Sequence, residues 1–284
     1  MKKIGYIICF MVFILAGCSK TIGKNEEVFY NPFIQNLVTY NNQSKEVELW
    51  DPADNQLQYP TGEADVYVDG NSQTNEFTLM KIDKSEITEL YDFPKNEGVF
   101  PIGEKDGTIY FVHSFYQEDG KEYLDKRTLS ALDLNTKEVT DYTNAKGLID
   151  YGVVGDEAIY YTVYDDDQDL YSLMKINYSD TSQSPETIKT GLQDGIVLLN
   201  GQELYYSDGK KLISDNHEFK KESVNFFYQG SLFQFYLNEE GSLSLKMTNP
   251  KDDSVYSEED IEGIRLEDDQ IKICKPGQVI NHDL

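Results

Sequence analysis

The sequence predicts an all-β protein, and within that class a β-propeller of six blades. Beyond residue 30, apolar and polar residues alternate strictly and no long stretch has helical periodicity. A turn followed by an aromatic strand recurs six times, and a hairpin pattern alternates with it. A repeat of about 40–45 residues containing four short strands is typical of propeller blades.

The first repeat places one large apolar residue at a matching position in each copy. These anchors are 28 to 50 residues apart and comprise Tyr67, Tyr110, Tyr160, Tyr205, Phe233 and Ile271. The shortest spacing, between Tyr205 and Phe233, requires residues 211–220 to supply two very short strands. Five or seven blades are the alternative counts, and a plain β-sandwich or two-sheet meander is the alternative architecture.

The second repeat is a hairpin whose turns are rich in Asn, Asp and Ser, which bond nearby backbone amides. Its copies occupy residues 37–49, 78–90, 130–142, 172–177 and 244–256. The chain opens with such a hairpin and closes with two strands, at 261–266 and 270–274, that no hairpin follows. Pairing the N-terminal hairpin with the C-terminal strands would close the ring and remove exposed sheet edges.

The N-terminus has the features of a secretory signal. Lys2 and Lys3 precede an apolar run over residues 4–15, which is too short for a membrane-spanning helix. The following Leu15-Ala16-Gly17-Cys18 resembles the bacterial lipobox. That resemblance implies cleavage before Cys18 and attachment of diacylglycerol to the Cys18 sulfur, and two acyl chains suffice for stable anchoring.

These signals divide the chain into four parts. We expect a signal peptide at 1–17, a lipidated tether at 18–29, a propeller domain at 30–276 and a tail at 277–284. The tether is inferred because residues 19–27 are polar and aperiodic. The mature protein is expected at the outer, extracytoplasmic face of the cell membrane, which it would contact through its lipid.

The composition excludes some partners. The 284 residues carry 25 Lys and Arg against 51 Asp and Glu, a net charge of −26. Nucleic acids bind through Lys and Arg contacts to phosphates, so a nucleic-acid partner is not expected. The aromatic content of 13% is too high for a disordered chain. The charge instead fits a tethered domain kept in solution near anionic surfaces.

The sequence contains no recognisable motif for catalysis or cofactor binding. His113, His217 and His282 lack zinc spacing, and neither a Gly-x-Ser-x-Gly elbow nor a glycine-rich phosphate loop occurs. We therefore predict no catalytic residue and no cofactor.

One acidic run merits comparison with a calcium loop. Asp165, Asp167 and Asp169 occupy positions 1, 3 and 5 of the calcium-loop spacing, but Leu170 stands at the sixth position and Ile176 at the twelfth. This pattern favours a solvated hairpin tip and leaves the three aspartates as weak metal candidates.

Four carboxylates fall where the inner strand of a blade should begin. Gly147-Leu-Ile-Asp150 and Gly191-Leu-Gln-Asp194 match at a spacing of 44 residues, and Glu97 and Glu262 take similar places in other blades. One interpretation is a partial ring of carboxylates around the axis that binds a cation or a basic ligand, with Asp150, Asp194 and Glu262 as ligand-binding candidates. The other is repeated turn chemistry, in which each acid caps the start of a strand.

A further resemblance concerns the hairpin at residues 131–139. Its Ala131-Leu-Asp133 before a Thr-Lys turn resembles the quinoprotein-type propeller repeat, but the Gly and Trp of that repeat are missing, so quinone binding is not implied. More broadly, residues 30–275 are similar to extracytoplasmic propeller lipoproteins of unassigned function.

The sequence thus favours a binding or interaction module that presents one propeller face to a small ligand or a neighbouring envelope protein. One alternative is a carbohydrate-active hydrolase that uses carboxylates near the axis. The other is an accessory subunit of an envelope transporter or sensor.

Overall fold

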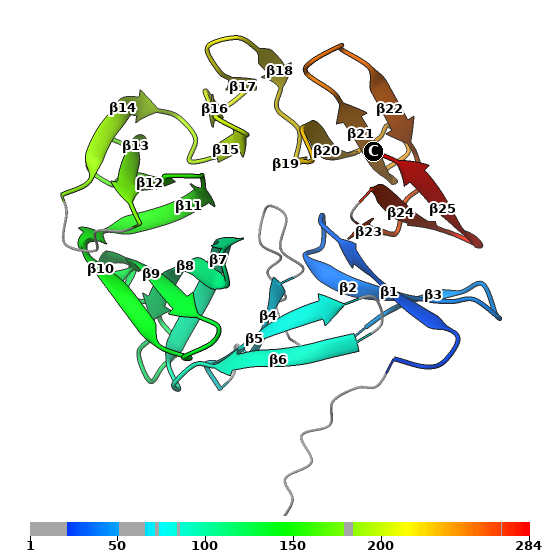
Figure 1. Ribbon diagram of the computed structural model, residues 1–284, viewed down its shortest axis with the longest axis horizontal. Coiled ribbons are helices and arrows are strands. Elements are labelled where there is room, and N and C mark those ends of the chain that lie inside the picture. Colours follow the sequence, from blue (N-terminus) through cyan, green and yellow to red (C-terminus); the bar gives the residue numbers. More distant parts are fainter. Residues whose placement is uncertain (1–21, 51–65, 72–73, 84–85, 179–183, 268) are drawn as a thin grey trace, which may run out of the picture.

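Six β-sheets surround a central axis in the computed structural model of the chain (Figure 1). The structure describes residues 22–50, 66–71, 74–83, 86–178, 184–267 and 269–284. The all-β class and the six-bladed propeller predicted from the sequence are confirmed. Within these ranges the one helix is the short 3-10 helix η1 (Leu124–Lys126), and none has the length and hydropathy needed to cross a membrane.

The first three sheets follow one another along the chain. The first contains β4 (Val66–Asn71), β5 (Glu76–Asp83) and β6 (Glu86–Asp92). The second contains β7 (Glu97–Lys105), β8 (Thr108–Phe115), β9 (Thr128–Asp133) and β10 (Val139–Lys146). The third contains β11 (Leu148–Val154), β12 (Ala158–Asp165), β13 (Leu170–Asn177) and β14 (Glu186–Leu192).

The next two sheets have four strands each. One contains β15 (Val197–Asn200), β16 (Glu203–Ser207), β17 (Lys211–Ile213) and β18 (Glu218–Lys220). The other contains β19 (Val224–Tyr228), β20 (Ser231–Leu237), β21 (Leu243–Thr248) and β22 (Val255–Glu258). The two very short strands required between Tyr205 and Phe233 are therefore present as β17 and β18.

The sixth sheet combines both ends of the chain. Its strand order is β25-β24-β23-β1-β2-β3. The N-terminal part consists of β1 (Glu26–Asn31), β2 (Asn36–Asn41) and β3 (Val47–Leu49). The C-terminal part consists of β23 (Gly263–Glu267), β24 (Gln270–Lys275) and β25 (Gln278–Asp283). This sheet closes the ring, as the sequence predicted.

Two boundaries in that sheet differ from the sequence prediction. The tether was expected to reach residue 29, but β1 begins at Glu26, and the tail expected from residue 277 forms β25. Strand β1 begins with two glutamates and β25 is mostly polar, so neither shows a clear alternation of apolar residues in sequence. Each pairs along its whole length with a neighbour, β1 with β2 and β25 with β24.

The core lies between adjacent sheets. Five anchors of the aromatic repeat fall on corresponding strands, β8, β12, β16, β20 and β24, and Tyr67 falls on β4. Tyr205, Phe233 and Ile271 are completely buried. Phe233 belongs to a cluster that joins the β19–β22 sheet to Ile264 and Ile273 of the closing sheet. The apolar residues of each sheet therefore pack against the next sheet rather than against one central layer.

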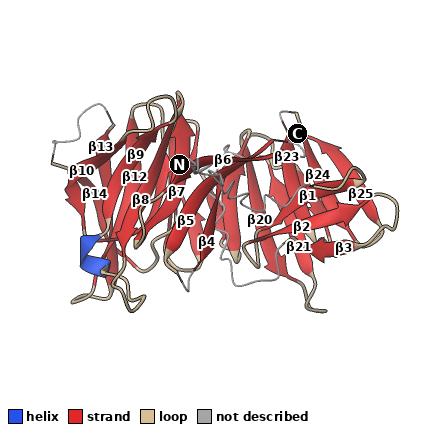
Figure 2. Ribbon diagram, turned by 90° about the horizontal axis from the view of Figure 1, so that it is seen from below, coloured by secondary structure: helices blue, strands red, loops and turns tan. Residues whose placement is uncertain are grey.

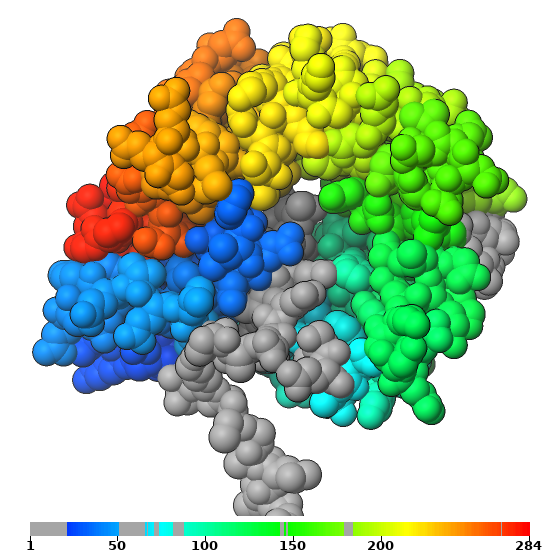
Figure 3. Space-filling view, turned by 180° about the vertical axis from the view of Figure 1, so that it is seen from behind, coloured from blue at the N-terminus to red at the C-terminus, as the bar shows by residue number. Residues whose placement is uncertain are grey.

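Strands β7, β11, β15, β19 and β23 lie innermost in their sheets (Figure 1). Their ends lie together, as the contact between Tyr228 of β19 and Glu267 of β23 shows, so these strands run in the same direction and the molecule has two distinct faces. We define the start face as the one where these strands begin, and the turn face as the one where they turn into β8, β12, β16, β20 and β24. The loop carrying η1 joins β8 to β9 on the start face, and Figure 2 shows η1 and the C-terminus at opposite edges of the ring. Figure 3 views the molecule from behind.

Candidate functional site

A cavity of about 520 Å³ opens on the turn face of the ring. The ends of β7, β11 and β15 line it, together with Phe226 and Phe227 of β19. Consecutive sheets contribute because their inner strands converge on the axis. Its ionisable lining residues are Glu104, Lys105, Asp106 and Asp156, three acids and one base.

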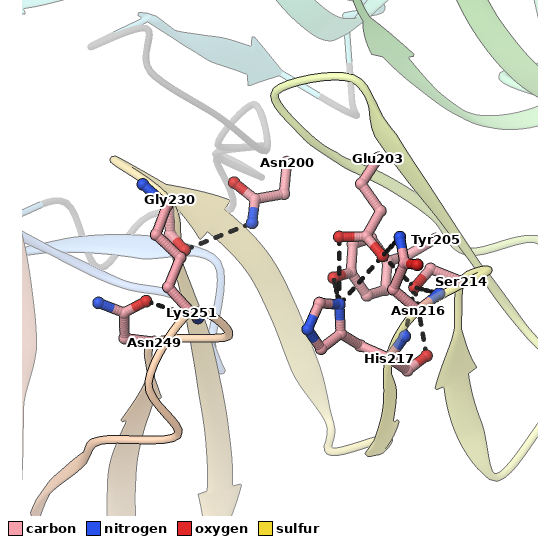
Figure 4. Close-up of polar contacts among 9 residues, drawn as sticks. All are labelled: Asn200, Glu203, Tyr205, Ser214, Asn216, His217, Gly230, Asn249 and Lys251. Atoms are coloured by element: carbon pink, nitrogen blue, oxygen red, sulfur yellow. Dashed lines mark hydrogen bonds and ion pairs between the residues drawn. The ribbon is translucent and has the colours of Figure 1, made fainter.

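Polar side chains link the turns around this cavity. Lys105 Nζ donates to the Asp156 carbonyl oxygen at 2.7 Å and lies 3.6 Å from the Asp156 carboxylate. Gln202 Nε2 donates to the other carboxylate oxygen of Asp156 at 2.5 Å. Asn200 Nδ2 reaches the Gly230 carbonyl oxygen at 3.4 Å, as Figure 4 shows. Four successive sheets are therefore tied together at the rim, which preorganises the cavity.

Asp150 lies at the start of β11, as predicted, but its carboxylate has partners within the protein. Arg127 Nη1 donates to Oδ1 and the Tyr171 hydroxyl donates to Oδ2, both at 2.9 Å. Arg127 also forms a two-pronged pair with Glu122 and donates to the Ile149 carbonyl oxygen. Burial, followed by the neighbouring Asp150, raises the pKa of Tyr171, so its hydroxyl remains a donor.

Asp194 precedes β15 and combines a turn role with an ion pair. Its Oδ1 accepts from the Ile196 backbone amide at 3.0 Å, which is the strand-capping geometry that the sequence offered as one interpretation. Its Oδ2 accepts from the Ser207 hydroxyl at 3.1 Å and contacts Lys221 Nζ. The next residue, Gly195, packs against Tyr151 and against Tyr171, whose hydroxyl donates to Asp150.

The other two carboxylates also lie on the start face. Glu97 Oε2 is 3.1 Å from Nε2 of the buried His113, whose Nδ1 lies 3.5 Å from Asp141. The backbone of Glu262 contacts strands from both ends of the chain. Its amide donates to the Cys274 carbonyl oxygen, and its carbonyl oxygen accepts from Asn31 Nδ2. Asp150, Asp194 and Glu97 each face a basic or imidazole group, so these three do not form a ring of free carboxylates.

The acidic run at residues 165–169 forms the turn between β12 and β13. Asp165 Oδ1 accepts from the backbone amides of Asp167 and Gln168, and the Tyr164 hydroxyl donates to Asp169 at 2.6 Å. The run is therefore a hairpin tip, as predicted from Leu170 at the sixth position of the calcium-loop spacing. No group of three or more potential metal ligands comes together in the part of the chain that the structure describes.

A polar network in the β15–β18 sheet was not foreseen from the sequence. Glu203 Oε1 accepts from the Ser214 hydroxyl at 2.6 Å and lies 3.0 Å from His217 Nδ1 (Figure 4). Burial acts to raise the pKa of Glu203, but hydrogen bonds from Ser214, His217, Tyr205 and Asn216 outweigh it and lower the pKa to about 2. Ser214 donates to the carboxylate rather than to the imidazole, so the three groups hold a turn and are not arranged as a nucleophile and its base.

Comparisons with known proteins support the fold alone. No protein-family model matches the chain, and no curated protein is significantly similar to it in sequence. Among solved structures, TolB from Acinetobacter baumannii has a TM-score of 0.54 at 11% identity, over 84% of this chain and 64% of TolB. The acylaminoacyl peptidase of Pyrococcus horikoshii has a TM-score of 0.53 at 13% identity, over 87% of this chain and 46% of the peptidase.

A third similar structure is a propeller domain by itself. The β-propeller domain of the Trilobed protease from Pyrococcus furiosus, described as having an open velcro topology, has a TM-score of 0.50 at 12% identity. The match covers 84% of this chain and 79% of that domain. The chain therefore spans less than two thirds of TolB and about half of the peptidase, but most of an isolated propeller.

Proposed function

We propose that this chain is a non-catalytic binding module, held by a lipid on Cys18 at the outer face of a bacterial cell membrane. The observation that carries the proposal is the cavity of about 520 Å³ on the turn face, whose rim is tied together by Lys105, Asp156 and Gln202. A concave, preformed site lined by a few convergent polar groups is the usual form of a small-ligand site. Three acidic side chains and one basic side chain line this cavity, so its charge suits a ligand with a cationic group.

The chain enters β1 on the same side of the ring as the cavity. Strand β1 is antiparallel to β23, so Glu26 lies toward the turn face and Asn31 toward the start face. Cys18 itself lies outside the described residues, eight positions before Glu26. Eight residues span at most about 28 Å. Lipidation at Cys18 would therefore bring the turn face near the membrane and leave the start face pointing away from it.

The hydrolase alternative receives less support from the carboxylates. An acid catalyst needs a carboxyl group with a raised pKa inside the cavity. The charge of Asp92 raises the pKa of the neighbouring Glu89, but both residues lie on the outer strand β6 and not in the cavity. That strand is remote from the axis, at the outer edge of its sheet.

A titration with a defined cation tests the binding proposal. Putrescine, a simple diamine, should bind the wild type and bind at least tenfold more weakly to the variant Glu104→Gln/Asp106→Asn. Asn tolerates the positive φ of 52° at residue 106, so the variant should fold. Glu118→Gln, an exposed acid on the β8–β9 loop of the start face, is the matched control and should bind as wild type does. Equal affinities in all three proteins would refute the cavity as the binding site.

A further inference from the structure

Three exposed apolar side chains gather on the start face around one hollow. Phe33 and Ile34 form the tip of the β1–β2 turn, and Leu237 ends β20; their exposed fractions are 40%, 50% and 46%. All three line a hollow of about 660 Å³. The other large exposed apolar residues lie singly on other elements, which is normal for a protein surface.

The two turns that present these side chains are held rigidly. Asn31 Oδ1 accepts from the backbone amides of Phe33 and Ile34 at 3.0 and 3.2 Å, while its Nδ2 donates to the Glu262 carbonyl oxygen at 2.8 Å. On the opposite side, Asn238 Oδ1 accepts from the amides of Glu240 and Ser242. Preorganised turns lose little entropy on binding, which favours a docking role. Figure 3 shows the blue N-terminal strands beside the orange β19–β22 sheet.

The rim of this hollow is acidic. Asp260 and Glu262 line it, and Glu239 and Glu240 occupy the neighbouring β20–β21 turn. The base that lines the hollow, Lys275, donates to Glu258 at 2.7 Å, so its charge is already balanced. A basic partner would therefore find complementary charge around an apolar centre, the arrangement typical of protein interfaces.

We propose that the hollow between the β1–β2 turn and the end of β20 is a docking site for a segment of another protein that presents apolar side chains flanked by Lys or Arg. The acidic rim selects this occupant over a second copy of the chain, which would bring the same carboxylates together, and over an anionic membrane surface. The site lies on the start face, opposite the axial cavity. The proposal therefore goes beyond the ligand-binding function above and does not depend on it.

Synthetic peptides provide defined probes for this site. One peptide alternates Phe and Arg, a second replaces each Arg with Glu, and a third keeps Arg but replaces each Phe with Ser. In fluorescence anisotropy titrations we expect only the Phe/Arg peptide to bind. Ile34→Ser/Leu237→Ser should weaken its binding at least tenfold, whereas Val255→Ser, at an equally exposed apolar position on β22, should have no effect.

The charge requirement is tested with a second variant. Asp260→Asn/Glu262→Gln should weaken binding and flatten its salt dependence, and Asn again tolerates the positive φ at residue 260. Melting temperatures of all variants should match wild type because the altered side chains are partly exposed. The cavity variant Glu104→Gln/Asp106→Asn should bind the peptide normally, which separates this proposal from the proposed function.

Several outcomes would overturn the docking proposal. They are failure of the Phe/Arg peptide to bind wild type, equal binding of the Phe/Glu peptide, or unchanged binding by the Ile34→Ser/Leu237→Ser variant. Wild-type dimerisation that this variant abolishes would assign the hollow to a second copy instead. Adsorption to anionic phosphatidylglycerol vesicles that the variant abolishes would assign it to lipid.

Discussion

Arg265 of β23 and Glu27 of β1 form an ion pair across the joint that closes the ring, with Nη2 2.8 Å from Oε2. The register between these two strands contains a single residue pair, Tyr30 with Ile264. Arg265 also donates to Glu267 at 3.0 Å, and Lys272 lies 3.6 Å from the same Glu27 oxygen. Side chains from the two ends of the chain therefore reinforce a short backbone contact.

The pair should make ring stability depend on pH. Burial acts to raise the pKa of Glu27, but hydrogen bonds from Asn42 and Arg265 and the charges of Arg265 and Lys272 lower it below its ordinary value. A lowered pKa in the folded state gives stability that is present above the unfolded-state pKa, near 4.5, and is lost as the pH falls through the folded-state value. Glu27→Gln should cost about 1 kcal/mol at pH 7.

Urea unfolding at pH 7 and at pH 3 measures this effect. The difference between wild type and Glu27→Gln should shrink at pH 3, which lies below the unfolded-state pKa of the carboxyl group. Glu48→Gln, an exposed acid on β3 of the same sheet, is the matched control and should leave stability unchanged at both values. A difference that stays constant with pH would show that the charge of Glu27 is not what stabilises the joint.

Packing at the joint gives a second prediction. Phe29 is buried against Val38, Tyr40 and Cys274, so it connects β1 and β2 to β24. Phe29→Ala should lower the free energy of unfolding by about 3–5 kcal/mol through lost burial and the cavity left behind. Phe33→Ala, four residues later and exposed, should cost less than about 0.5 kcal/mol. If Phe29→Ala cost as little as Phe33→Ala, the N-terminal strands would contribute little to the stability of the fold.

The sequence predicted the fold well wherever a strand is buried on one face. Alternation located the strands that carry Tyr205, Phe233 and Ile271, because each must face a neighbouring sheet. It failed at Glu26–Glu27, which looked like part of a solvated tether. Their strand is stabilised instead by Arg265, a residue 238 positions away, and no local pattern contains that information.

Prediction of the candidate site was limited by the same kind of long-range contact. The matching motifs placed Asp150 and Asp194 correctly at the starts of inner strands. Their cationic partners, Arg127 and Lys221, come from loops at unrelated spacings and could not be assigned. The residues that line the axial cavity were also not identified, because the strand ends that form it, such as residues 104–106 and 155–156, resemble any other turn in sequence.

The Glu203 network gives a third prediction, which compares stability at neutral and at acidic pH. The folded-state pKa of Glu203, about 2, lies below its ordinary value of 4.5. Its stabilisation is therefore complete above pH 4.5 and is lost as the pH falls toward 2. Glu203→Gln should cost about 1–2 kcal/mol at pH 7, since the carboxylate is hydrogen-bonded but still reached by solvent.

Chemical unfolding at pH 7 and pH 2.5 is the appropriate measurement. The cost of Glu203→Gln should be largest at pH 7, and Glu157→Gln, at an exposed turn position in the preceding sheet, should be neutral throughout. A Glu203→Gln protein as stable as wild type at pH 7 would contradict a stabilising role for the hydrogen bonds from Ser214 and His217.

The last prediction concerns the anchor, which depends on Cys18 because only a thiol can form the thioether with diacylglycerol. In a bacterial host, Cys18→Ser should abolish labelling by radioactive palmitate and leave the precursor uncleaved by the lipoprotein signal peptidase. Cys274→Ala is the control, because Cys274 is buried in the closing sheet and should not affect processing. Membrane fractionation and N-terminal mass spectrometry report the result. If the Cys18→Ser protein kept the wild-type mature terminus and stayed with the membrane fraction, the lipobox interpretation would be wrong. The orientation that places the axial cavity toward the membrane would then be lost with it, while the docking hollow on the start face would still be testable in the soluble protein.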